Sequence, residues 1–117
     1  MGGRGATGGA GGAAANQKMP ELAGSAKQIK WAQDIRSSLL GAADLLVRNA
    51  QRNRELGISP SFNSPSVTAA GVVRSDVIKT FKNVTDASVI INKLRGQNYD
   101  TLFRLATAYD RSKGING

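Results

Sequence analysis

Apolar residues recur at helical spacing after residue 25. They stand four, four, three, four and four positions apart: Trp31, Ile35, Leu39, Ala42, Leu46 and Ala50. This period places them on one face of an α-helix. Leu40, Ala43 and Val47 add a second stripe, so we expect the middle of this helix to be buried on more than one side. Gly41 lies between the stripes and predicts the close approach of another helix.

Both ends of this helix carry capping signals. Ser25 followed by Gln28 has the spacing of a capping box, in which each residue satisfies a backbone N–H of the other. Gly57 stands where a helix commonly ends on a left-handed residue, and no proline interrupts the stretch between. These signals predict one long helix over residues 26–55.

The next segment leaves two structures open. Residues 57–66 contain two prolines and four serines, which is typical of a loop. In residues 67–83 the line Ala70, Val73, Val77 and Phe81 indicates a helix. The β-branched residues between 67 and 73 are also compatible with an extended segment. We favour the helix.

Two shorter helices complete the pattern. Thr85 is a candidate N-cap for the first, which Gly96 ends, and Asn98 is a candidate N-cap for the last. Their apolar residues repeat at helical spacing: Ala87, Ile90, Ile91 and Leu94, then Leu102, Leu105, Ala106 and Tyr109. The sequence therefore predicts an all-α fold. It is a small helical bundle with one long N-terminal helix and about three shorter helices, over residues 25–117.

The first 24 residues have a different composition. They hold eight of the 14 glycines, a run of alanines and few large apolar side chains. Such a segment cannot bury enough surface to offset its ordering entropy. We expect residues 1–24 to be a disordered glycine-rich tail.

Charge and absent residue types narrow the function. Lys and Arg total 16 against 8 Asp and Glu, a net charge of +8 that favours anionic partners. Cysteine and histidine are both absent, and the carboxylates form no metal-binding or catalytic pattern. We expect no enzyme activity, catalytic residue, metal or cofactor. No apolar run is long enough to cross a membrane, so we expect a cytoplasmic protein of the host cell.

The basic residues most suited to a partner form three groups. Arg48, Arg52 and Arg54 lie at the end of the predicted long helix, and Arg48 and Arg52 share a face. Asn49, Gln51 and Asn53 stand between them and can hydrogen-bond phosphates or base edges. Cations at this position also offset the helix dipole, which is a purely structural alternative. The other two groups are Lys27 with Lys30, and Lys79, Lys82, Lys93 and Arg95 on two neighbouring helices.

Aromatic residues are few. Trp31 lies on the apolar stripe, so burial in the core is favoured over base stacking. Tyr99 and Tyr109 are expected to be packed as well. With 5% aromatic residues, the chain has no stacking platform of the RNA-recognition kind.

Two segments resemble a family of small phage and plasmid proteins. Residues 24–36, GSAKQIKWAQDIR, resemble a G-S-E-K-Q-I-x-W-A-x-x-I-R motif that opens small proteins of phages, plasmids and related mobile elements. Residues 85–92, TDASVIIN, resemble their later T-x-A-x-W-W-I-D segment. Here Ala26 and Asn92 replace acids, and Val89 and Ile90 replace the aromatic pair. The resemblance implies a mobile-element setting, in which some small proteins inhibit host defences, such as anti-CRISPR proteins, and others bind DNA.

The charge and the resemblance together predict a non-enzymatic accessory protein of a phage or mobile element. Its partner would be nucleic acid or a host nucleoprotein effector, bound through a basic helical surface. One alternative is a protein-binding inhibitor of a host defence effector that meets an acidic protein surface. Another is a structural or scaffold component of a virion.

Overall fold

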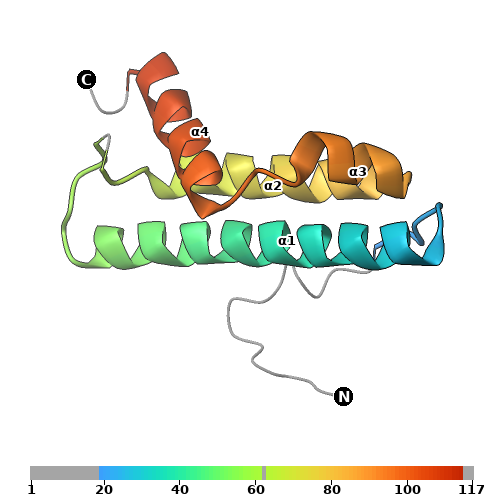
Figure 1. Ribbon diagram of the computed structural model, residues 1–117. Helices are drawn as coiled ribbons and strands as arrows, with labels where there is room; N and C mark the ends of the chain where they lie inside the picture. Colours follow the sequence, from blue (N-terminus) through green and yellow to red (C-terminus); the bar gives the residue numbers. More distant parts are fainter. Residues whose placement is uncertain (1–18, 62, 115–117) are drawn as a thin grey trace.

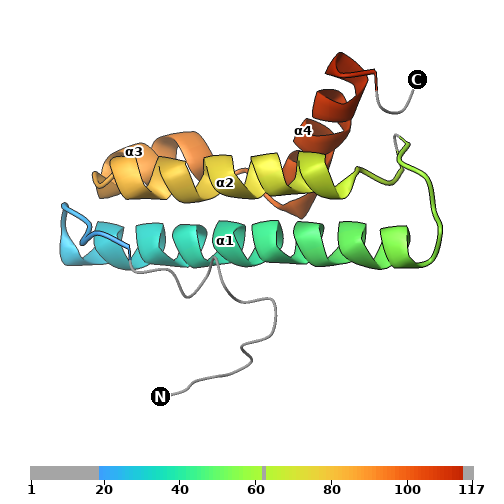
Figure 2. The ribbon, with the colours of Figure 1, turned by 180° about the vertical axis from the view of Figure 1, so that it is seen from behind.

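The computed structural model describes residues 19–61 and 63–114, and they form four helices. The helices are α1 (Ala26–Glu55), α2 (Val67–Asn83), α3 (Ala87–Leu94) and α4 (Tyr99–Ser112). Helix α2 runs antiparallel along α1. Helix α3 then reverses direction and lies over the end of the bundle where α1 begins (Figure 1). Helix α4 starts near the middle of α1 and projects away at an angle, as the reverse view also shows (Figure 2). The predicted all-α bundle with one long first helix is confirmed.

Local capping explains where the helices begin and end. Gln28 N–H donates to Ser25 Oγ at 3.2 Å, and Ser25 N–H donates to Gln28 Oε1 at 3.1 Å, so the predicted capping box is present. Gly57, just past α1, has a positive φ of 78°. Asn98 caps α4, also as predicted. The N-cap of α3 is Asp86 and not Thr85, because the Asp86 carboxylate accepts the Ser88 N–H.

Residues 67–83 are helical, which resolves the two alternatives. Ser66 supplies the N-cap of α2, because its Oγ accepts the Ala69 N–H at 3.0 Å. Ala70, Val73 and Phe81 are buried as the helical spacing predicts. Packing of this face against α1 therefore overrides the β-branched composition of the segment.

The core lies where α1 meets the other three helices. Its largest fully buried apolar side chains come from all four helices: Phe81, Leu40, Leu46, Ile90 and Leu102. Leu39, Leu40, Ala43 and Leu46 are all buried, so the middle of α1 is enclosed on more than one side, as predicted. Gly41 does not receive a neighbouring helix. A Cβ there would meet nothing within 4 Å, and the prediction of a close approach was wrong.

Trp31 also departs from its prediction. Its side chain is 46% exposed, whereas the neighbouring Ala32 is fully buried. In the first turns of α1 the buried face of the helix therefore does not include Trp31. The short helix α3 covers this part of α1. The indole instead lies beside a guanidinium, with Arg95 Cζ at 5.9 Å from the ring centroid.

The chain joins the bundle before the capping box. Ala23 N–H donates to the Thr85 carbonyl at 2.8 Å, and Ala87 N–H donates to the Ala23 carbonyl at 2.8 Å. Leu22 is buried in the core. Residues 19–24, which the sequence places in the glycine-rich tail, therefore pack against the bundle: Ala23 and Gly24 lie beside the start of α3, and the Pro20 carbonyl accepts from Arg36 of α1. The rest of that predicted tail, residues 1–18, falls outside the described residues.

A buried carboxylate ties the end of α4 to the start of α2. Asp110 is 0% exposed. Its two oxygens accept the Ser66 N–H at 2.7 Å and the Ser66 O–H at 2.6 Å. The Asp110 side chain is therefore buried and binds the N-cap of another helix. This Ser66–Asp110 link holds the loop before α2 against α4.

Candidate nucleic-acid interface at the end of the long helix

The nine predicted basic residues are all exposed, and the helices divide them between the two ends of the bundle. At a rise of 1.5 Å per residue, Lys30 and Arg48 are about 27 Å apart along α1. The end where α1 begins, which we call the lysine end, holds Lys27, Lys30, Lys79, Lys82, Lys93 and Arg95 (Figure 1). The end where α1 finishes, the arginine end, holds Arg48, Arg52 and Arg54. The nine residues therefore do not form one patch.

At the lysine end the cations surround a tightly closed junction. Arg95 follows α3, and its guanidinium lies over the Trp31 ring, near Lys27 and Lys30 in the chain. Lys79 and Lys82 occupy the last turns of α2. Helices α2 and α3 run in opposite directions (Figure 2).

At the arginine end, backbone groups already cap the helix. The Leu56 N–H donates to the Arg52 carbonyl at 3.0 Å, and the Gly57 N–H donates to the Arg54 carbonyl at 3.1 Å. Arginine side chains are therefore not needed to satisfy these carbonyls. The helix dipole favours Arg52 and Arg54 in the last turn, but its effect does not reach Arg48, almost two turns earlier. The dipole thus explains only part of the cluster.

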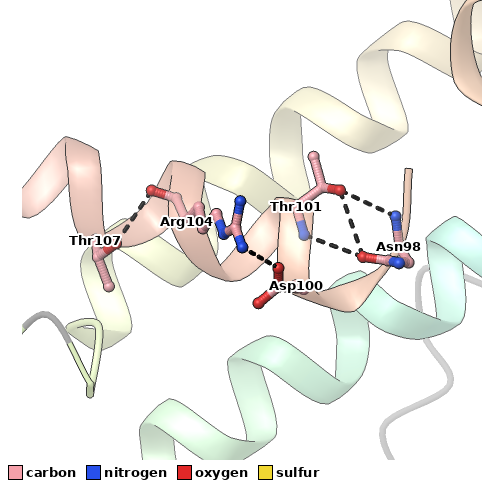
Figure 3. A network of polar contacts seen from close by, with 5 residues as sticks. All are labelled: Asn98, Asp100, Thr101, Arg104 and Thr107. Atoms are coloured by element: carbon pink, nitrogen blue, oxygen red, sulfur yellow. Dashed lines mark hydrogen bonds and ion pairs between the residues drawn. The ribbon is translucent and has the colours of Figure 1, made fainter. Parts of the chain in front are cut away.

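These three arginines have no carboxylate partner within residues 19–61 and 63–114. The ion pairs in that part of the chain are Arg74–Asp44 at 2.8 Å and Arg104–Asp100 at 2.9 Å. Figure 3 shows how the second pair belongs to a set of contacts that stay within α4, with Asn98 and Thr101 bonded at its start. Arg104 is thus neutralised locally. Arg48, Arg52 and Arg54 present their charge to solvent.

The surface around these arginines is hollowed. Arg48 and Arg52 line one shallow hollow, which confirms that they share a face. Arg54 lines two others, one of them with Ile58 and Thr68, and so it points differently. Glu55 also lines the Arg48–Arg52 hollow and one of the two Arg54 hollows, whereas the Arg54 hollow with Ile58 and Thr68 has no acidic lining residue.

A cavity of about 270 Å³ adjoins the Arg48–Arg52 hollow. Arg52 and Asn49 line both. The remaining lining residues come from α1, from the loop before α2 and from α4: Leu46, Ala50, Asn53, Pro65, Tyr99 and Phe103. Sequence reasoning identified Asn49 and Asn53 but missed the two aromatic residues. They are about 50 positions away in sequence, and no local pattern pointed to this contact.

Side-chain hydrogen bonds fix the cavity's polar groups. Asn49 Nδ2 donates to the Tyr99 hydroxyl at 2.9 Å, and Asn53 Nδ2 donates to Ser64 Oγ at 3.1 Å. Gln51, the third amide singled out in the sequence, lies outside this cavity and lines the hollows beside it. The cavity thus combines one cation, two oriented amides and a phenol with an apolar floor.

A second cavity, of about 310 Å³, has a different character. It lies between α2 and α4, above Leu39 of α1, and most of its lining is apolar. Leu105 at this cavity is 53% exposed. Its one charged lining residue is Asp76, so it offers no cation to an anionic ligand.

The carboxylates of the described residues are held in structural contacts or spread apart. Asp44 is buried and paired with Arg74, Asp86 caps α3, and Asp110 binds Ser66. Within residues 19–61 and 63–114, no three acidic side chains come together as a metal site. In the same part of the chain, no helix combines the length and the apolar character needed to cross a bilayer.

The two segments that carry the family resemblance meet at the lysine end. Ala23 and Asp86 form an isolated parallel bridge just before the helices that contain most of these residues. Gly24 approaches so closely that a Cβ there would lie 3.2 Å from the Cβ of Ala87. The beginnings of the two segments therefore meet at a structural junction, at the opposite end of α1 from the cavity.

Comparison of the chain with models of protein families, with curated proteins and with solved structures finds no match.

Proposed function

We propose that this protein is a non-enzymatic accessory protein of a phage or mobile element that binds nucleic acid, free or in a nucleoprotein complex, through its arginine end. One observation carries the proposal. Arg48, Arg52 and Arg54 are exposed, have no carboxylate partner in residues 19–61 and 63–114, and are not needed as caps. Guanidinium groups bind phosphates through paired, charge-assisted hydrogen bonds.

Charge elsewhere on the molecule supports the same class of partner. The net charge of +8 raises the local concentration of polyanions around the protein and speeds their association. Long-range attraction alone does not choose a site. The free guanidinium groups and adjoining hollows favour the arginine end as the place where phosphates are held.

The experiment compares two triple variants that lose the same charge. Arg48→Ala/Arg52→Ala/Arg54→Ala removes the arginine end, and Lys27→Ala/Lys30→Ala/Lys93→Ala removes three exposed cations at the lysine end. Fluorescence anisotropy with labelled oligonucleotides measures affinity at rising salt. We expect the arginine triple to lose about 30-fold or more in affinity at low salt, and the lysine triple to lose only a few-fold.

The salt dependence adds an independent measure. Three phosphate contacts predict that the slope of log affinity against log salt flattens by about 2 to 3 in the arginine triple. Equal losses in both triples would mean that only net charge matters. Absence of binding by the parent protein at low salt would reject the proposal.

The apolar cavity favours a second candidate, a protein-binding inhibitor of a host defence effector. Its floor is apolar and the half-exposed Leu105 lies at its edge, which suits an apolar side chain of a partner. A pull-down from host lysate after nuclease treatment tests this candidate. A stoichiometric partner that Leu105→Asp releases and the arginine triple retains would support it over nucleic-acid binding.

A further inference from the structure

The cavity at the arginine end opens beside the proposed path of phosphates. Arg52 and Asn49 line both this cavity and the shallow hollow that contains Arg48. A nucleic-acid backbone lying between Arg48 and Arg52 therefore passes the mouth of the cavity. A chemical group attached to that backbone can therefore point into the cavity.

The cavity walls match a flat, partly polar ring. Leu46, Ala50 and Pro65 are buried and form an apolar floor. The rings of Tyr99 and Phe103 lie side by side, with centroids 6.3 Å apart and planes inclined by 39°. Both are half-buried, so part of each ring is accessible from the cavity. Aromatic faces of this kind hold bases by stacking.

The polar groups retain unused hydrogen-bonding capacity. Each asparagine Nδ2 has two hydrogens and donates one, to the Tyr99 hydroxyl from Asn49 and to Ser64 Oγ from Asn53. Within residues 19–61 and 63–114, the second N–H and the Oδ1 of each amide have no hydrogen-bond partner, which leaves each amide a donor and an acceptor. That arrangement pairs with the edge of a nucleobase. The Tyr99 hydroxyl accepts from Asn49 and keeps its own hydrogen to donate.

We propose that this cavity receives one unpaired nucleobase of a single-stranded nucleic acid while Arg52 binds the adjoining phosphate. The proposal rests on the function proposed above and specifies its substrate class. A base in a duplex is stacked and paired on both sides, and it cannot enter a recess without leaving the helix. A single strand offers bases at little cost. DNA and RNA share the base and the phosphate, and they differ in the 2′-hydroxyl.

The first test separates the contribution of the base to affinity from the contribution of the phosphate. Anisotropy is measured with short single-stranded DNA, with the same strand containing abasic positions, and with the matching duplex. All three carry phosphates. We expect the intact single strand to bind about tenfold tighter than the abasic strand, because a stacked base is lost. Equal binding of all three overturns the cavity proposal and leaves phosphate binding standing, whereas binding by none overturns both.

Paired variants locate the effect. Tyr99→Phe removes the hydroxyl from the cavity at the arginine end, and Tyr109→Phe removes the corresponding group from the apolar cavity. We expect Tyr99→Phe to cut the preference for the intact strand about threefold or more, with Tyr109→Phe unchanged. Both substitutions keep the ring, but Tyr99→Phe also removes the acceptor of the Asn49 hydrogen bond, so circular dichroism and thermal melting must show that both variants fold. Equal preferences in both variants and the parent overturn the assignment to this cavity.

The last arm uses single-stranded RNA of the same sequence. Tighter binding of RNA that survives Tyr99→Phe identifies an additional contact to the 2′-hydroxyl, and equal binding identifies a site that reads base and phosphate alone. In either case the abasic strand must be the weaker ligand. A preference for the abasic strand in both nucleic acids contradicts the proposal.

Discussion

The two ends of α1 differ in the contacts that connect them to the rest of the bundle. At the lysine end, backbone hydrogen bonds join Ala23 to the start of α3, and Gly24 touches Ala87. At the arginine end, side chains make the connections: Asn49 to Tyr99, Asn53 to Ser64 and Ser66 to Asp110. The Arg36 side chain adds a hydrogen bond to the Pro20 carbonyl before α1, and the cavity at the arginine end lies beside the Asn49–Tyr99 connection.

The number of charges does not separate these ends. The lysine end holds more of the predicted cations than the arginine end. What distinguishes the arginine end is that oriented polar groups and hollows lie beside the free guanidinium groups. A candidate binding site is therefore better recognised by the shape and hydrogen-bonding capacity around its charges than by the charges themselves.

The largest expected effect comes from breaking the closure of the arginine end. Asp110→Ala removes two hydrogen bonds to a buried carboxylate and strands the Ser66 N–H. We expect a loss of about 3 kcal/mol in the free energy of unfolding. The melting temperature should fall by about 12–20 °C. Thermal melting by circular dichroism measures it.

Asp100→Ala is the matched control for this variant. Asp100 also accepts from a side chain, but its pair with Arg104 is exposed and lies within α4 (Figure 3). Such pairs contribute about 0.5 kcal/mol or less. If Asp110→Ala and Asp100→Ala lost equally little free energy of unfolding, the side-chain contacts at the arginine end would not stabilise the fold.

Breaking the closure of the lysine end should cost somewhat less. Gly24 has a φ of 147°, and a Cβ there meets Gln28 Oε1 at 3.1 Å and Ala87 Cβ at 3.2 Å. Gly24→Val should therefore destabilise the protein by about 2 kcal/mol. Oligonucleotide affinity of the folded fraction should stay unchanged. Denaturant unfolding and anisotropy measure the two effects.

Gly41→Ala provides the control with opposite sign. Gly41 lies inside α1 and its added Cβ meets no atom within 4 Å. Alanine there should raise stability by about 0.5–1 kcal/mol through helix propensity alone. Destabilisation by Gly41→Ala would show that another segment does approach this face of α1.

A variant with a smaller effect tests which end of α1 binds the oligonucleotide. Trp31→Ala removes an exposed aromatic side chain and its contact with Arg95. Loss of one exposed cation–π contact costs about 0.5–1 kcal/mol of stability. Because Trp31 belongs to the lysine end, oligonucleotide affinity should change less than about twofold. A tenfold loss of affinity would move the binding site to the lysine end.

The smallest effect concerns pH. Hydrogen bonds from the Ser88 side chain and then its backbone N–H lower the pKa of Asp86 below the ordinary 3.8. A lowered folded-state pKa stabilises the protein above the unfolded value, and this contribution disappears as pH falls through the folded value. Carboxyl NMR titration should show the low pKa, and Ser88→Ala should raise it toward 3.8. An unchanged pKa in that variant would remove Ser88 as its cause.

Local signals in the sequence predicted most of the helices. Ser25 with Gln28, and Asn98 at the last helix, act within one turn, so their spacing alone identifies them. Gly57 ends α1 for the same reason. Thr85 was the wrong N-cap because Thr85 and Asp86 are both residue types that can cap a helix. The Thr85 carbonyl instead accepts the Ala23 N–H in the bridge.

Long-range contacts were the part that sequence spacing did not predict. Asp110 pairs with a residue 44 positions away, and Asn49 pairs with Tyr99 across 50 positions. The arginines and asparagines of the candidate site were visible because they are neighbours along one helix. Tyr99 and Phe103 join them only through the angle at which α4 crosses α1, which no periodicity encodes.

The Ser66–Asp110 link also bears on the order of folding. Ser66 can cap α2 as soon as that helix forms, but Asp110 can reach Ser66 only after α4 has docked. Hydrogen exchange at the Ser66 amide therefore reports on release of α4. We expect α4 to detach as a single unit before the α1–α2 hairpin unfolds, carrying Tyr99 and Phe103 away and dismantling the cavity first.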